Sequence, residues 1–233
     1  LPSVSTLVLG GEACPADLVS RWAIPGRRML NTYGPTETTV VATMSECHPD
    51  EPVTIGRPLP GYAVVVVDEE GQPVPVGTPG ELLIGGDAVS SGYLNREALT
   101  AEKFIENPFP ERLSGIARLY RTHDLVCENA DGNIQFLGRI DDQVKIRGFR
   151  VELQEIESTL LDEEAIRGAA VKVVHVNGLP DIAAYVMLNE GAELDRDALL
   201  ARMRTRLPDY MIPRYLDVLQ SLPVTTSGKI DRA

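Results

Sequence analysis

The stretch around which the rest of the sequence is organised runs Asn31-Thr32-Tyr33-Gly34-Pro35-Thr36-Glu37-Thr38-Thr39. Met29 and Leu30 stand directly before it and predict a short strand. Gly34-Pro35 then predicts a tight loop. Because ligands bind beyond the carboxyl ends of strands in parallel sheets, the residues after this strand are candidates for a ligand site.

Three side chains of this stretch suit a nucleotide. Tyr33 offers a flat ring for a base, Thr36 a hydroxyl for a phosphate, and Glu37 a hard oxygen ligand for magnesium. Taken alone, the stretch is explained equally well as an ordinary polar turn.

The residues before this stretch predict a layered α/β region. Residues 5–9 form an apolar run ending in Gly10-Gly11, which favours a buried parallel strand. Pro15 suits the first turn of a helix that reaches Trp22, and Pro25-Gly26 stops it. The first residues, to about position 45, therefore indicate the end of a strand–helix–strand unit.

The middle of the chain predicts a small β-rich barrel over residues 52–138. Its expected strands are Tyr62–Val67, Glu81–Ile84 and Ile134–Leu137, and the Asp131-Gly132 dipeptide before the last indicates a hairpin. One helical insertion is expected near residues 96–104.

The last third predicts a compact α+β domain. Val144 to Val151 is a basic hairpin, and apolar residues from Leu153 to Leu161 recur at helical spacing. Two strands, Ala169–Val176 and Ile182–Leu188, are separated by an Asn177-Gly178 turn.

A second helix is expected in this domain. Asp195 is its N-cap, its apolar positions include Leu199, Met203 and Leu207, and Pro208 ends it. The predicted fold class is therefore α/β and α+β. Residues 1–140 form a large core, with an α/β layer to about residue 50 and a β-rich part over 51–140, and residues 141–233 form a small domain.

Composition narrows the class of protein. The 233 residues carry a formal net charge of -12, which argues against a broad nucleic-acid surface. No stretch is long and apolar enough to span a bilayer, and no basic segment followed by an apolar run indicates a signal peptide. The three cysteines have no metal-ligand spacing and favour reduced thiols in a cytoplasmic protein. Because position 1 is not Met, we expect a cut inside a longer chain.

Further strings follow in a fixed order, and together they resemble the later core motifs of the acyl-adenylate-forming superfamily. The resemblance is closest to the adenylation domain of a nonribosomal peptide synthetase, and several motifs in order are far more specific than one. The strings lie at residues 80–86, 92–94, 120–124, 138–148, 207–213 and 226–232.

The resemblance implies that the chain binds ATP and Mg²⁺. Tyr33 would stack on adenine, Thr36 would hold the α-phosphate, and Glu37 would coordinate magnesium. Asp124 would accept hydrogen bonds from the ribose hydroxyls, which suits an ionised carboxylate. The full set of implied nucleotide contacts is Gly11, Glu12, Ala13, Asn31, Thr32, Tyr33, Thr36, Asp124 and Arg139.

The resemblance also assigns the chemistry. Lys229 would be the catalytic residue, neutralising charge as the substrate carboxylate attacks the α-phosphate. Asp141 would be the hinge of the small domain, and Lys145 would face the site in a second half-reaction. In that step the acyl group would pass to the phosphopantetheine thiol of a carrier (thiolation) domain. Taken alone, Lys229 is a solvated tail lysine and Asp141 a plain linker acid.

The implied amino-acid pocket consists of Val8, Gly10, Thr32, Val40 and Val41. The pattern resembles pockets for lysine-like amino acids. The alternative interpretation is that these residues are the core of a buried strand and carry no information about the substrate.

The sequence departs from the family pattern at His123, Ser90-Ser91 and Gln154, and by the absence of an N-terminal half. His123 stands where glycine is usual before Asp124, so its side chain would crowd the nucleotide or add a contact. The N-terminal half of an adenylation core, with its phosphate loop, is missing, so this fragment alone should be inactive. Two alternatives remain: an acyl-CoA ligase that uses free CoA, and a non-catalytic fragment that binds a nucleotide or a partner.

Overall fold

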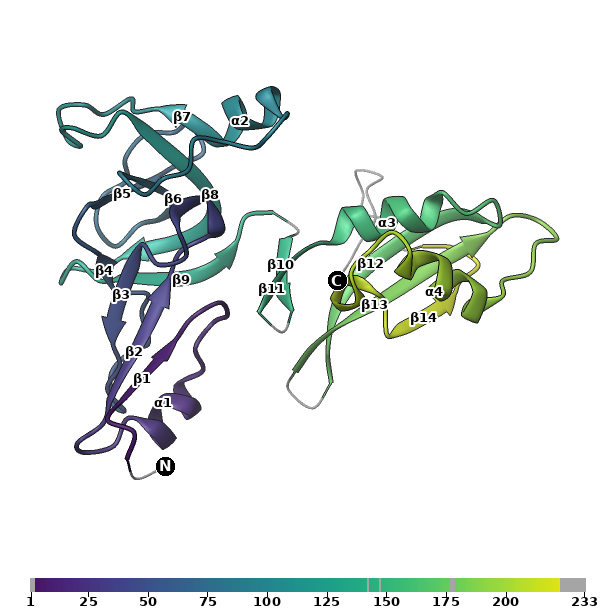
Figure 1. Ribbon diagram of the computed structural model, residues 1–233, viewed down its shortest axis with the longest axis horizontal. Coiled ribbons are helices and arrows are strands. Elements are labelled where there is room, and N and C mark those ends of the chain that lie inside the picture. The colour runs from purple at the N-terminus through teal and green to yellow at the C-terminus, as the bar shows by residue number, and fades with distance from the viewer. Residues whose placement is uncertain (1–2, 142, 147, 177–178, 223–233) are drawn as a thin grey trace. The chain divides into compact units, whose positions relative to one another are not determined.

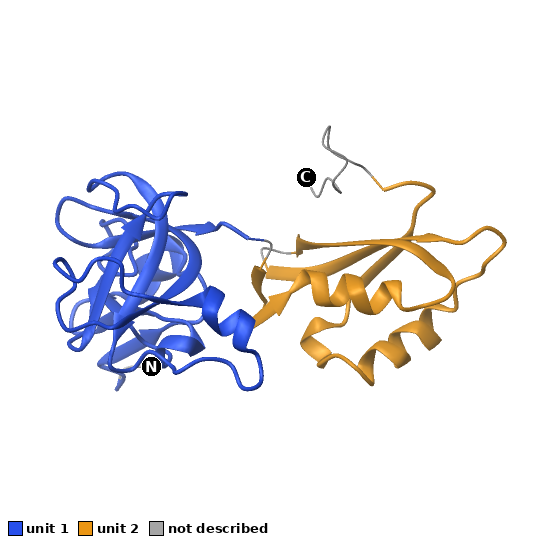
Figure 2. Ribbon diagram, turned by 90° about the horizontal axis from the view of Figure 1, so that it is seen from above, with its two compact units in different colours: residues 1–141 blue, residues 142–233 orange. Residues whose placement is uncertain are grey.

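The computed structural model describes residues 3–141, 143–146, 148–176 and 179–222. The chain divides into two compact units, residues 1–141 and 142–233, which Figure 2 colours separately. The predicted Asn177-Gly178 turn and the string at residues 226–232, including Lys229, lie outside the described residues.

Unit 1 begins with a four-stranded sheet and one helix (Figure 1). The first two strands are parallel and flank the helix, so the predicted strand–helix–strand unit is confirmed. The next two strands pair antiparallel. In chain order the elements are β1 (Thr6–Leu9), α1 (Ala16–Trp22), β2 (Arg28–Tyr33), β3 (Thr43–Glu46) and β4 (Arg57–Pro58).

The expectation that β1 is buried is wrong. It is an edge strand, and α1 covers the sheet on one face only, through the buried Val19. Because successive side chains of a strand point to opposite faces, Leu7 and Leu9 pack against this cluster whereas Val8 is 62% exposed.

The second sheet of unit 1 has five strands. Its path is β5–β6–β8–β7, with β9 also on β8, and among the described residues it stays open rather than closing into a barrel. The predictions did not include β8, its longest strand. The elements are β5 (Tyr62–Val67), β6 (Pro79–Gly86), α2 (Glu97–Lys103), β7 (Phe104–Glu106), β8 (Arg118–Glu128) and β9 (Ile134–Arg139).

Both faces of this second sheet are buried. Val66, Leu82 and Ile84 pack in a cluster that includes Tyr33 and Ala42 from the region of the first sheet. The intervening residues Val65, Val67 and Leu83 pack on the opposite face. A strand covered on both faces reads as a continuous apolar run, which explains the sequences of β5 and β6. The shared cluster fixes the end of β2 against β8.

Unit 2 contains a hairpin and a three-stranded sheet packed against two helices (Figure 1). In the sheet, β12 and β13 are antiparallel, and β14 pairs parallel with β13. The elements are β10 (Gln143–Ile146), β11 (Phe149–Glu152), α3 (Leu153–Leu161), β12 (Ile166–Val176), β13 (Leu179–Leu188), α4 (Arg196–Arg204) and β14 (Tyr215–Val218).

The predicted start of α4 is confirmed, but its predicted end is wrong. The Asp195 side chain accepts a hydrogen bond from the Ala198 N–H at 3.0 Å, as an N-cap does. The helix ends at Arg204, before Leu207 and Pro208. A residue before proline is pushed out of helical geometry, so Leu207 leaves the helix and still reaches the core. None of the helices in the described part of the chain has the length and apolarity to cross a bilayer.

Candidate functional site

The loop after β2 makes a sharp, tightly packed turn. A side chain at Gly34 would place its Cβ 2.7 Å from the Ala42 nitrogen, so only glycine fits there. A 3₁₀ turn follows at Thr36–Thr38. Thr39 and Val40 then adopt left-handed backbone conformations, with φ of 58° and 71°. Such values are strained for β-branched residues and mark a conformation imposed by the surroundings.

Asp124 lies at the centre of the site, on β8. Its carboxylate is buried, with 3% of the residue exposed. It accepts a hydrogen bond from the Tyr33 hydroxyl and another, at 2.8 Å, from Arg139 Nη1. Asp124 and Arg139 face each other in register across β8 and β9. The structure thus brings together three predicted site residues from three separate strings.

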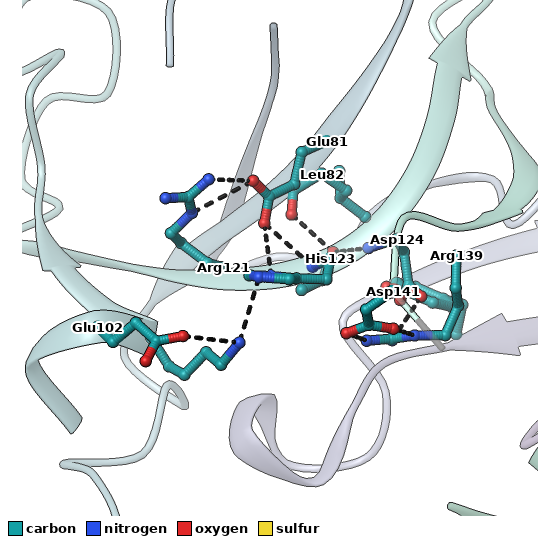
Figure 3. Close-up of polar contacts among 11 residues, drawn as sticks. Glu81, Leu82, Glu102, Arg121, His123, Asp124, Arg139 and Asp141 are labelled. Atoms are coloured by element: carbon teal, nitrogen blue, oxygen red, sulfur yellow. Dashed lines mark hydrogen bonds and ion pairs between the residues drawn. The ribbon is translucent and has the colours of Figure 1, made fainter. Parts of the chain in front are cut away.

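Arg139 joins Asp124 to a second carboxylate. Its Nε and Nη2 donate to the two Asp141 oxygens at 2.6 and 2.7 Å, as Figure 3 shows. This two-pronged contact uses the planar fork of the guanidinium. The last residue of unit 1 is therefore tied directly to the Asp124 site.

The Tyr33 ring is buried and packs near Phe136, with ring centroids 6.3 Å apart. Burial, together with the charge of Asp124 and the hydrogen bond to it, raises the pKa of Tyr33 well above its ordinary value. The phenol therefore remains a proton donor to Asp124 at working pH. The predicted stacking of this ring on adenine stays a prediction.

A local irregularity of β8 directs Asp124 into the site. The pairing of β6 with β8 shifts register between Glu81 and Leu83, which leaves extra residues in β8 opposite Leu82. His123 adopts φ of 56° within this bulge. The Asp124 N–H donates to Thr122 Oγ1 at 3.0 Å. Bulges of this kind turn side chains to new directions.

Glu81 holds the bulge in place. One of its oxygens accepts the His123 N–H at 3.1 Å and lies 3.0 Å from the His123 Nδ1, while the other accepts from Arg121 Nη2 at 2.5 Å (Figure 3). Burial alone would raise the pKa of Glu81, but His123 and Arg121 outweigh it and lower this pKa to about 2. Glu81 is therefore ionised at neutral pH.

The His123 ring also reaches α2. Its Nε2 lies 3.2 Å from Lys103 Nζ. The contacts of His123 are thus to protein groups, and the two expectations about its effect on the nucleotide stay predictions. Glu81 and Lys103 were missed because nothing in the sequence links positions so far apart. The one sequence signal that His123 makes special contacts was its bulk at a position where the family pattern has glycine.

Glu37 lies in the 3₁₀ turn and is 8% exposed. Its Oε1 accepts a hydrogen bond of 2.6 Å from the Tyr93 hydroxyl. The described residues contain no group of three or more potential metal ligands. A single carboxylate nevertheless fits Mg²⁺, which commonly binds through one or two carboxylates plus substrate phosphates.

The other predicted nucleotide contacts are divided between structural and exposed positions. The buried Asn31 side chain donates to the Thr54 carbonyl at 2.8 Å, and Thr32 Oγ1 donates to the Leu9 carbonyl at 2.6 Å. Thr36 is exposed, and so are Gly11, Glu12 and Ala13 in the loop after β1.

The predicted amino-acid pocket includes unusually exposed apolar residues. Val8 is 62% exposed and Val40 69% exposed, so neither is buried in a core of unit 1. The assignment of the five residues to a pocket stays a prediction. Gly10 lies against Thr32, because a Cβ at Gly10 would be 2.6 Å from Thr32 Oγ1. Val41 is partly buried.

Lys145 lies in β10, in the β10–β11 hairpin of unit 2, and is partly buried. Lys229 is outside the described residues. The roles given to Lys145, Lys229 and Asp141 stay predictions.

Comparison with known proteins gives a consistent picture. The model of the AMP-binding enzyme family matches residues 1–94, and that of the AMP-binding enzyme C-terminal domain matches residues 155–229. All of the chain aligns at 45% identity with delta-poly-L-ornithine synthetase of Acinetobacter baumannii (strain AB307-0294), covering 18% of that protein. It aligns, again over its whole length and at 45% identity, with phosphinothricin tripeptide synthetase PhsC of Streptomyces viridochromogenes, covering 21%.

A solved structure agrees with these relatives. The structure of holo-PA1221, described as an NRPS protein containing adenylation and PCP domains, superposes with a TM-score of 0.84 at 30% identity. The match covers 98% of this chain and 39% of that one. The chain thus spans well under half of each of these proteins.

Proposed function

Because the chain belongs to the AMP-binding enzyme family, we propose that it forms part of an adenylation domain of a nonribosomal peptide synthetase. The protein that contains it activates an amino acid as acyl-AMP with ATP and Mg²⁺. It then transfers the acyl group to the phosphopantetheine thiol of a carrier domain.

The observation that carries this proposal is the buried Asp124 carboxylate held by Tyr33 and Arg139. A carboxylate can accept about four hydrogen bonds, so it can serve protein donors and ribose hydroxyls together. Arg139 keeps Asp124 ionised and therefore an acceptor only. The ribose is the part of ATP whose two neighbouring hydroxyls match such an acceptor.

Thr36 and Glu37 follow Tyr33 in the chain and complete the nucleotide site. Thr36 holds the α-phosphate with its hydroxyl, and Glu37 is the magnesium ligand. When bound, Mg²⁺ neutralises phosphate charge. The loop residues Gly11, Glu12 and Ala13, with the Asn31–Thr32 backbone, contact the adenine edge.

Lys229 supplies a positive charge between the substrate carboxylate and the α-phosphate. The acyl–oxygen–phosphorus bond forms as the bond to pyrophosphate breaks, and an ammonium nearby stabilises the charge that develops. Asp141 acts as the hinge between the two half-reactions, and Lys145 lies in the hairpin used in the second.

The relatives support a carrier domain as the partner and a basic amino acid as the substrate. PA1221 contains adenylation and PCP domains, and one relative is named a poly-L-ornithine synthetase. The exposed Val8 and Val40 line a pocket for the aliphatic part of a lysine-like side chain.

The test is exchange of labelled pyrophosphate into ATP, driven by a panel of carboxylic acids. The protein is the complete gene product that contains this chain, and lysine and ornithine lead the amino acids. Exchange with one amino acid supports the proposal and names the substrate. Exchange with only fatty or aryl acids would instead support an acyl-CoA ligase, and no exchange at all a non-catalytic protein.

Lys229→Ala separates the two half-reactions. We expect it to abolish exchange, while transfer of the acyl group from preformed adenylate to the carrier thiol stays largely intact. Equal loss of both reactions would remove Lys229 from its assigned role.

A further inference from the structure

The segment that follows β6 holds the loop that contains Glu37. The Ser90 N–H donates to the Glu37 carbonyl at 2.8 Å, and Thr39 Oγ1 donates to the Ala88 carbonyl at 2.7 Å. Farther along the same segment, Tyr93 donates its hydroxyl to Glu37 Oε1 at 2.6 Å. The first two contacts fix the backbone of the turn, and the third reaches a Glu37 carboxylate oxygen.

Neighbouring residues fix the position of the Tyr93 ring. Gly92 has φ of 140°, and a Cβ there would lie 2.3 Å from Thr100 Cγ2. This close approach lets the Tyr93 N–H donate to Thr100 Oγ1 at 2.9 Å. The ring meets Phe104 edge to face, with centroids 5.4 Å apart, and Phe104 in turn packs on Tyr120 at 5.0 Å. The phenol position is thus set by α2, β7 and β8.

An ionised carboxylate has no proton to donate, so the Tyr93 hydroxyl is the donor in the 2.6 Å contact with Glu37 Oε1. The contact therefore acts as a fixed support for that oxygen.

We propose that Tyr93 is the positioning residue for the Glu37 carboxylate, and that it sets the affinity of the site for the divalent cation of the nucleotide complex. The proposal deepens the proposed function and rests on it, since Glu37 is there the magnesium ligand. Mg²⁺ requires near-ideal octahedral geometry, so a ligand carboxylate that can rotate binds it less well. Partners of a ligand contribute to metal affinity, and their loss typically costs about 10–100-fold.

Tyr62 provides a matched control. Its hydroxyl donates to the Thr38 carbonyl at 2.7 Å, so it braces the same turn from β5 through a backbone oxygen. Tyr93→Phe and Tyr62→Phe each remove one phenolic oxygen from contact with this turn. If Tyr93 only braces the fold, the two variants will behave alike.

The experiment uses the complete protein that contains the chain and measures two quantities. The first is the Mg²⁺ concentration that gives half-maximal pyrophosphate exchange at saturating ATP. The second is Mn²⁺ bound in the presence of a non-hydrolysable ATP analogue, measured from the loss of the free Mn²⁺ signal in electron paramagnetic resonance. The Mn²⁺-binding measurement needs no turnover. It therefore tests the role of Tyr93 even if no carboxylic acid supports exchange and the proposed function is wrong.

We expect Tyr93→Phe to weaken Mn²⁺ binding by about 10–100-fold, while Tyr62→Phe leaves it close to wild type. In a Glu37→Gln background, Tyr93→Phe should cause little further change, because its effect passes through that carboxylate. Unchanged Mn²⁺ binding in Tyr93→Phe would overturn the proposal. So would equal losses in the two tyrosine variants, or a full additional loss in the Glu37→Gln background. A Tyr93→Phe protein that melts like Tyr62→Phe excludes misfolding as the cause.

Discussion

The two units use the same chemical pair, a carboxylate with a guanidinium, in opposite surroundings. In unit 1, Arg139 and Asp124 are 13% and 4% exposed at their side chains. In unit 2, Arg206 and Asp162 are 53% and 58% exposed. Their closest N–O distances, 2.8 and 2.6 Å, are similar, so burial is the real difference.

The cores of the two units also differ in how much charge they bury. Unit 2 has one large apolar cluster, which includes Leu160 and Leu199. Among the described residues, unit 1 has three smaller clusters and buries the charged residues Glu37, Glu81 and Asp124, whereas unit 2 buries one, Asp181. Burying charges costs free energy that apolar packing would not, so a fold keeps them where it needs oriented charge. The comparison teaches that unit 1 buries more charge than unit 2, and so gives up more packing stability to build its site.

The largest effect should follow from Asp124→Asn. It breaks a buried ion pair, and such changes cost about 3–5 kcal/mol of unfolding free energy. We expect the lower end, because Arg139 keeps its contact with Asp141. Urea unfolding measures this loss, and ATP binding should also weaken at least about tenfold. Unchanged ATP affinity would remove Asp124 from the nucleotide site.

A smaller effect is expected from the charge of Glu81, and it depends on pH. The folded-state pKa is lowered from 4.5 to about 2. The stabilisation by Glu81 is therefore complete above about pH 4.5 and is lost as the pH falls towards 2. This linkage amounts to at most about 3 kcal/mol. Unfolding measured across this range should show a shallower acid dependence in Glu81→Gln than in wild type. Parallel curves would contradict the assignment.

The smallest effect is expected from Asp162→Asn in unit 2. The chemical change equals that in Asp124→Asn, but the pair is exposed and screened by water. Exposed pairs contribute about 0–1 kcal/mol. Urea unfolding of the two variants side by side tests the comparison directly. A cost at Asp162 as large as that at Asp124 would show that burial is not the deciding difference.

Much of the fold follows from local patterns in the sequence. Tyr62–Val67 is predicted with its observed bounds, and Asp195 caps α4 as expected. The strand β8 was missed, since the polar run from Arg121 to Asp124 separates its two short apolar segments, 119–120 and 125–127. Polar residues in a central strand break the apolar run, and they are there because the strand carries the site.

Only the site residues that lie in recognisable sequence motifs could be predicted. Asp124, Arg139 and Tyr33 were named from their strings, and the structure brings them into contact. The supports of these residues were not predicted. Tyr93 approaches Glu37 across 56 positions, and Glu81 approaches His123 across 42. Contacts of that separation depend on sheet register, which no local pattern reveals.

The left-handed backbone at Val40 has a consequence for how the substrate range of this protein can change. A β-branched residue is strained in that conformation, whereas glycine or asparagine adopts it readily. Replacement of Val40 by either would reshape the proposed amino-acid pocket and relax its backbone together. Under the proposed function, either replacement would therefore alter the pocket without needing a compensating change elsewhere in the chain.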